Sequence, residues 1–203
     1  MIFRTIYILL VLGAVVLVNN LFGYDLEILK EKILPEKEMV EVDIYFNNKE
    51  EDPFLFDCSR VWPVARKVNS HTEIFGLKIN RRKVEDIAQS AIEKLLKGPT
   101  SEEKEGGYVS GIPDKEEIRR YKEIIIGGGH KSPFKGDEIK LLSLKIEDGI
   151  AFIDFSKELA SYGGGSCKTA AIRSQIDKTL KQFKEIKKVV ISIEGQVEEA
   201  LQP

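Results

Sequence analysis

Hydrophobic and polar residues alternate at the start of the region that follows residue 39. This alternation predicts a strand over 40–46, because successive side chains of a strand point to opposite faces of a sheet. A second strand is predicted over 60–68, and its Pro63 favours a sheet edge or a strand start, because proline cannot donate a ladder hydrogen bond. The side chains expected to face the interior in the first strand are Val42, Ile44 and Phe46.

Two later segments carry hydrophobic residues at intervals of three and four, the spacing of a helix with one buried side. The first helix is predicted over 83–97, and Gly98 followed by Pro99 is typical of a helix end. The second helix follows the glycines at 163–165. Its expected buried stripe consists of Ile172, Ile176, Leu180 and Phe183.

A hairpin is predicted over 140–155. Two alternating runs there flank Asp148 and Gly149, a pair that is typical of a two-residue turn. A last alternating run predicts the final strand over 188–194.

The region 100–138 has a less regular pattern. A short strand is predicted at 108–112, and a helix is expected to begin at Asp114. The glycines at 127–129 end this helix before a polar stretch. We interpret 114–138 as an inserted helix and mobile loop.

The predicted elements follow the order β β α, an insert, and then β β α β. Each long helix has one apolar stripe to bury, and the natural partner of such a stripe is one face of a sheet. We therefore predict an α+β fold in which two helices pack on one face of a small mixed sheet of about four strands. The domain would cover 40–196, after a linker at 25–39 and before a C-terminal tail at 197–203.

The first 24 residues have the pattern of a membrane anchor. No charged side chain occurs from Thr5 to Tyr24, and a helix of that length is about 30 Å long, which matches the hydrocarbon thickness of a bilayer. Arg4 precedes the apolar run and charges of both signs follow it, so the N-terminus is expected in the cytoplasm and the domain outside. Because no small-residue cleavage site follows, we expect a retained single-pass signal anchor; the alternative is a protein secreted after signal cleavage.

The charge of the chain argues against a nucleic-acid partner. The sequence has 31 basic and 33 acidic residues, for a formal net charge of -2. Binding to the phosphates of a nucleic acid needs a clustered excess of Lys and Arg. We therefore expect no nucleic acid among the partners.

The sequence contains 2 cysteines, Cys58 and Cys167. In the oxidising compartment that the expected topology gives them, they are predicted to form a disulfide. The alternative is two unrelated small side chains in the core. A bridge between them would close a loop of more than a hundred residues, for which the chain-entropy model gives on the order of 4–5 kcal/mol of stabilisation.

The sequence predicts no catalytic, cofactor-binding or metal-binding residues. The glycine-rich run at 163–169 opens a helix, but it lacks the glycine spacing of a phosphate-binding loop. His71 and His130 do not have the spacing of a metal site. Neither histidine gives Ser156 or Ser166 an evident base for nucleophilic catalysis.

Three aromatic residues lie near Cys58 in the sequence, and they are Phe54, Phe56 and Trp62. One interpretation is an exposed surface that anchors a partner or stacks on sugars. The alternative is core packing beside the disulfide, which is the usual fate of large aromatic side chains.

An ordered set of motifs extends through the predicted domain: VEVDIYF at 40–46, WPVARKV at 62–68, AIEKLLKGPTSEE at 91–103, GYVSGIP at 107–113, LLSLKIEDGIAFIDFSKEL at 141–159, and GGSCKTAAIRSQIDKTLKQF at 164–183 before VVISIEG. This set resembles the GerMN domain family of sporulation and spore germination proteins over nearly all of 40–196. The resemblance implies an extracytoplasmic module, often tethered to a membrane, with a fold similar to ring-building modules. It supplies no catalytic residues, and the insertion at 114–138 departs from the family pattern.

Taken together, these features predict a non-enzymatic binding or assembly module of the bacterial cell envelope, related by resemblance to sporulation and germination. Its expected partners are envelope proteins or further copies of itself, with peptidoglycan as another candidate. The N-terminal helix is expected to contact the membrane. No cofactor is expected. The alternatives are a domain that binds cell-wall glycan or peptide and, with less support, a hydrolase.

Overall fold

The computed structural model describes residues 39–54, 56–69, 73–74, 77–78, 83–163, 165–197 and 201. The predicted anchor at 1–24 and nearly all of the predicted linker lie outside these residues. Within the described ranges, no helix combines the length and the apolar character that crossing a bilayer requires. The membrane anchor therefore stays a prediction from the sequence.

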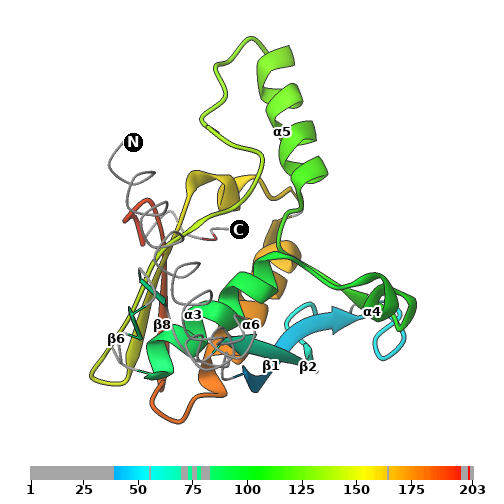
Figure 1. Cartoon of the computed structure of the whole chain (residues 1–203). Coiled ribbons are helices and arrows are strands. Elements are labelled where there is room, and N and C mark those ends of the chain that lie inside the picture. The colour runs from blue at the N-terminus through cyan, green and yellow to red at the C-terminus, as the bar shows by residue number, and fades with distance from the viewer. Residues whose placement is uncertain are drawn as a thin grey trace, which may run out of the picture. The chain divides into compact units, whose positions relative to one another are not determined.

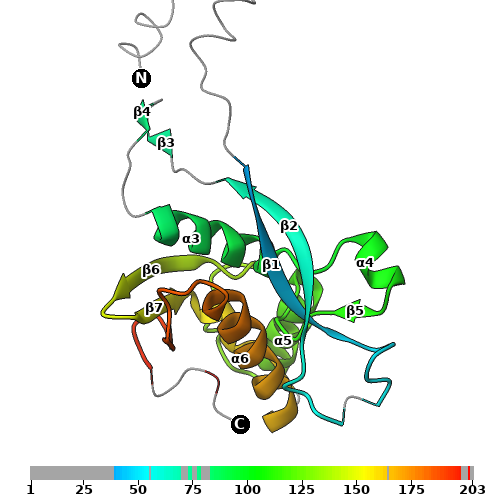
Figure 2. The ribbon, with the colours of Figure 1, turned by 90° about the horizontal axis from the view of Figure 1, so that it is seen from below.

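The first sheet has the predicted first strand at its centre. Its strand order is β2-β1-β5, and both neighbours of β1 are antiparallel to it. The bounds are β1 (Met39–Asn48), β2 (Trp62–Asn69) and β5 (Tyr108–Val109). Figure 2 shows β1 and β2 as a long twisted pair. Pro63 lies on the edge strand β2, opposite Tyr45, as its missing N–H predicted.

The second sheet contains the predicted hairpin and the predicted last strand. It consists of β6 (Leu141–Glu147), β7 (Ile150–Phe155) and β8 (Lys188–Ile193). Asp148 and Gly149 form the turn, and their φ angles of 49° and 78° are positive, as this type of turn requires. β8 pairs with β7 in parallel, so the sheet is mixed. The described residues also include a short hairpin of β3 (Glu73–Ile74) and β4 (Leu77–Lys78).

The described part of the chain has four α-helices and one short 3₁₀ helix. They are α3 (Lys83–Leu96), α4 (Ser101–Glu105), α5 (Lys115–Gly127), η1 (Lys157–Ala160) and α6 (Gly165–Lys181). Both long helices predicted from periodicity are confirmed, although Phe183 falls beyond the end of α6. The helix expected from Asp114 is confirmed as well, because the Asp114 carboxylate accepts the N–H groups of Glu116 and Glu117 and caps α5.

The prediction of one sheet of about four strands is wrong. Apart from the short β3–β4 hairpin, the described strands are divided between two three-stranded sheets, and α3 and α6 pack against each other and against both of these sheets (Figure 1). α3 contacts β1, β2 and β6, and α6 contacts β1 and β8. The physical reason lies in how much of each helix is buried. On α6 the buried positions cover roughly 180° of the circumference at 100° per residue, which is wider than the apolar stripe of about 100° that is typical of a helix with one buried side. These positions are Thr169, Ala171, Ile172, Gln175, Ile176, Thr179 and Leu180.

Arg66 on β2 fixes the C-terminal end of α3. Its guanidinium donates to the carbonyl oxygens of Lys94 and Gly98, each at 3.0 Å, and so satisfies acceptors that a helix end leaves unpaired. The same guanidinium pairs with the Glu103 carboxylate, with Nε 3.0 Å from Oε1. Burial alone would raise the pKa of Glu103, but hydrogen bonds from Arg66 and Thr100 outweigh it and hold the pKa below 4.5. The segment between α3 and α4 is therefore held to the first sheet.

Gln175 on α6 is a fully buried polar side chain that links three elements. Its Nε2 donates to Asn47 Oδ1 on β1 at 2.8 Å, and its Oε1 accepts the N–H of Gly111, just after β5, at 3.2 Å. Asn47 is also buried, and its Nδ2 donates to the carbonyl oxygens of Cys58 and Arg60 at 3.0 and 2.8 Å. A satisfied polar network of this kind fixes one arrangement of its members, because any other leaves buried groups unpaired.

We expect Gln175→Leu to destabilise the domain by roughly 2–4 kcal/mol, because the Asn47 oxygen and the Gly111 N–H would each lose a buried partner. Urea denaturation followed by circular dichroism, with the disulfide intact, measures this loss. Gln89→Leu is the matched control. Gln89 lies exposed on α3, so its replacement should change stability by less than about 0.5 kcal/mol. Equal effects of the two substitutions would contradict the network.

Candidate functional site

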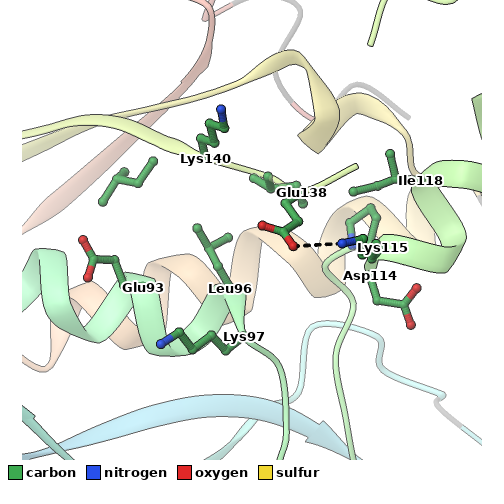
Figure 3. A pocket seen from close by; sticks show the side chains of 11 residues that line it. Glu93, Leu96, Lys97, Asp114, Lys115, Ile118, Glu138 and Lys140 are labelled. Carbon is green, nitrogen blue, oxygen red and sulfur yellow. Dashed lines mark hydrogen bonds and ion pairs between the residues drawn. The ribbon is translucent and has the colours of Figure 1, made fainter. Parts of the chain in front are cut away.

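A groove of about 800 Å³ lies between the C-terminal end of α3, the start of α5 and the start of β6. We call it the charged groove. Figure 3 shows Leu96 and Ile118 among its apolar side chains and the ion pair between Lys115 and Glu138, whose Nζ and Oε1 atoms are 3.3 Å apart. Charges of both signs line it in equal number, namely Glu93, Asp114 and Glu138 with Lys97, Lys115 and Lys140. Its chemistry suits a ligand or partner of mixed polarity.

A second hollow of about 560 Å³ adjoins the charged groove and shares Leu96, Lys97, Pro113 and Asp114 with it. It extends along β5 and the turn that precedes this strand. We call it the basic hollow, because four cationic side chains line it and only two acidic ones do. The cationic residues are Lys49, Lys97, Lys104 and Arg120, and the acidic ones are Asp114 and Glu117.

The loop after α5, which was predicted to be mobile, is tied to η1 and to α5. Glu158 on η1 is 4% exposed, and its Oε1 accepts the N–H groups of Lys135 and Gly136 at 2.9 and 2.7 Å. Burial alone would raise the pKa of Glu158, but the Ser156 hydroxyl and these backbone donors outweigh it and lower the pKa below 4.5. Phe134 from the same loop is buried, with its ring centroid 5.9 Å from that of Tyr121. These contacts position Glu138 and the residues after it at the rim of the charged groove.

The predicted disulfide is confirmed. Cys58, in the loop between β1 and β2, is bonded to Cys167, in the first turn of α6, and their Cα atoms are 5.3 Å apart. The two residues are 109 positions apart in the sequence. The bond therefore joins the β1–β2 loop to an element near the other end of the chain.

The aromatic residues of the β1–β2 loop lie at the surface. Phe54 and Phe56 are 78% and 87% exposed, and their ring centroids are 5.4 Å apart. Trp62 is half-buried at the start of β2, with the Arg60 guanidinium 5.3 Å from its ring centroid. Core packing is thus the wrong interpretation for the two phenylalanines. We call the segment between β1 and β2 that carries them the aromatic loop.

Partly buried hydrogen bonds fix the backbone of the aromatic loop. The Asp52 carboxylate, 6% exposed, accepts the N–H groups of Phe56 and Asp57 at 3.2 and 3.3 Å. The Asn48 Oδ1 accepts the N–H of Glu50 at 2.8 Å. These turns and the disulfide attach the loop to the end of β1 and to the first turn of α6. The acidic residues around the phenylalanines were the signal in the sequence for an exposed loop. The interpretation as core packing relied on the size of the aromatic side chains and did not weigh these acidic neighbours.

The residues considered for chemistry do not assemble around one another in the described part of the chain. His130 is exposed after α5, and the buried Ser156 hydroxyl accepts the N–H of Lys140 at 3.0 Å. Ser166 is exposed at the start of α6, and His71 lies outside the described residues. No group of three metal-ligating side chains occurs among the residues that the structure describes.

The described chain is thus an α+β domain with a disulfide-fixed aromatic loop and a charged groove. It belongs to the Germane family, described as "Sporulation and spore germination", whose model matches residues 43–199. This match confirms the resemblance identified from the sequence motifs. A comparison with curated proteins returns no significant match.

The solved structures that are similar to this chain include the following three. A candidate lipoprotein from Clostridium perfringens is 20% identical, with a TM-score of 0.42, over 81% of this chain and 80% of that one. The first GerMN domain of the sporulation protein GerM from Bacillus subtilis is 22% identical, with a TM-score of 0.43, over 78% and 85%. The tandem GerMN domains of GerM are 22% identical, with a TM-score of 0.44, over 78% of this chain and 40% of that one. These values are too low to transfer a function.

We expect Glu158→Gln to lower the melting temperature at pH 7 and to flatten its dependence on pH. Because the folded-state pKa lies below 4.5, the carboxylate stabilises the fold fully above pH 4.5 and loses this effect as the pH falls through the folded-state value. The curves of the variant and of the wild type should therefore converge in acid. Calorimetry between pH 7 and pH 3 tests this. Glu138→Gln, at a side chain that is 72% exposed, is the control and should stay close to the wild type.

Proposed function

We propose that this protein is a non-enzymatic binding module of the bacterial cell envelope, held at the outer side of the membrane, and that its aromatic loop is the main contact with a protein partner. The observation that carries the proposal is the pair of exposed phenylalanines on a loop whose backbone is fixed. Clustered aromatic side chains dominate the energetics of many protein interfaces. The family supports a place in sporulation or germination.

The fixed backbone of the aromatic loop favours binding. A loop that is ordered before it meets a partner loses little conformational entropy in the complex, so more of the contact energy appears as affinity. The Asp52 carboxylate and the disulfide provide this order for Phe54 and Phe56. The charged groove offers a second surface for the same or another partner.

The disulfide supports an extracytoplasmic location, because such bonds persist in oxidising compartments and are rare in the cytosol. The apolar run at 5–24 would then hold the domain at the membrane. A polypeptide partner would be another protein of the envelope. Peptidoglycan remains the rival ligand, since exposed aromatic rings also stack on sugars.

We expect Cys58 and Cys167 to react with a membrane-impermeant maleimide in intact cells only after reduction. The reason is that both sulfurs are bonded and would face the outside. A Cys58→Ser, Cys167→Ser double variant gives the background signal. Labelling that appears without reductant, and only after lysis, would place the domain in the cytoplasm and refute the location.

We expect a photo-crosslinking amino acid, p-benzoylphenylalanine, placed at Phe56 of the full-length chain to form polypeptide adducts in the native cell. The same amino acid at Phe152, which is 41% exposed on β7, is the matched control and should form few. Absence of adducts at both positions would remove the support for a protein partner. Retention by purified peptidoglycan that depends on Phe54 and Phe56 would then favour wall recognition.

A further inference from the structure

The aromatic loop carries an excess of negative charge around its phenylalanines. Glu50, Glu51 and Asp57 are exposed within a few residues of Phe54 and Phe56. The side chains of Glu50 and Glu51 take no part in the turn, because it is their backbone N–H groups that donate to Asn48. The loop therefore presents two aromatic rings with carboxylates beside them.

The basic hollow has the complementary character. Its apolar residues include Leu96, Pro99 and Ile112, and its rim carries the cationic side chains of Lys49, Lys97, Lys104 and Arg120. None of the ion pairs within the described ranges involves Lys49, Lys97 or Lys104.

The two acidic residues of the basic hollow are already engaged. The Asp114 carboxylate caps α5, and the Glu117 carboxylate binds Lys168 Nζ at 2.9 Å. The positive charge at the rim is therefore the charge that remains available to a ligand. An aromatic side chain beside a carboxylate matches both the apolar residues and this rim.

The aromatic loop and the basic hollow are neighbours on the same chain. Lys49 lines the hollow and begins the loop, and its N–H donates to the carbonyl oxygen of Gly107, which also lines the hollow. A Cβ atom on Gly107 would lie 2.7 Å from Glu50 Cγ, so the Glu50 side chain packs directly against this residue. Figure 2 shows the loop and the β5 segment at the same end of β1. The hydrogen bond from the Phe56 N–H to the Asp52 carboxylate and the disulfide to Cys167 hold the backbone of the loop in this place.

We propose that the aromatic loop of one copy occupies the basic hollow of a second copy, and that the second copy returns the same contact. In a pair related by a two-fold axis, the aromatic loop of each chain contacts the basic hollow of the other. This is possible because the loop and the hollow lie side by side on one chain, so the same contact forms twice across the axis. This inference rests on the proposed function and names the partner of the aromatic loop as another copy of this chain.

The test uses full-length chains with two different affinity tags, expressed together in the native cell and carrying p-benzoylphenylalanine at position 56. We expect adducts that contain both tags, with the crosslinked peptide mapped to the lining of the basic hollow between 96 and 113. An adduct within one chain would contain a single tag. Adducts that contain only a different protein would overturn the inference and leave the proposed function standing, whereas the absence of any adduct would remove both.

Charge reversal supplies the second arm of the test. Lys97→Glu with Lys104→Glu, and separately Glu50→Lys with Glu51→Lys, should each lower the two-tag adduct by about tenfold, because like charges would then face each other. The four substitutions together should restore it to within about twofold of the wild type. All four side chains are exposed, and mobility on a non-reducing gel shows whether each variant keeps its disulfide. Two-tag adducts that map outside the basic hollow, or charge reversals that fail to compensate, would contradict the proposed contact.

Discussion

The shared burial of α3 and α6 against two sheets is the constraint on which the described part of the chain depends. Each of the two larger sheets has only three strands, and both bury their apolar side chains against the same pair of helices. Burial of apolar area stabilises by about 25 cal/mol per Å², so loss of packing between the helices would expose the inner side chains of both sheets together. The strands and the helices are therefore parts of one core.

The buried hydrogen-bond network around Gln175 links the core to the aromatic loop at the surface. It connects α6 to β1 through Asn47, and Asn47 in turn holds the carbonyl oxygens of Cys58 and Arg60 at the end of the aromatic loop. The disulfide joins the same loop to the first turn of α6. The exposed phenylalanines thus lie on a segment whose position is fixed by contacts with the core.

The charged groove and the basic hollow are formed where helices and strands begin or end. Arg66 holds the segment after α3, the Asp114 cap begins α5, and Glu158 holds the loop that leads to β6. Each of these contacts places charged side chains around apolar residues such as Leu96. The family match gives the domain its place among sporulation and germination proteins.

Local patterns in the sequence determined where the helices, strands and turns form. Tertiary contacts decided which strands pair and which side chains are exposed. The strands at β1 and β8, the turn at Asp148 and the helix from Asp114 follow from alternation, turn chemistry and capping, which act between near neighbours. The disulfide could be predicted because the chain has 2 cysteines and the expected topology places them in an oxidising compartment. Alternation shows which face of a strand is buried but not which strand lies beside it, so the division into two sheets was not predictable. Likewise, Phe54 and Phe56 are exposed on a loop that is held by the Asp52 carboxylate and by the disulfide from Cys58 to Cys167. The two cysteines are 109 positions apart, and only the folded chain brings them together.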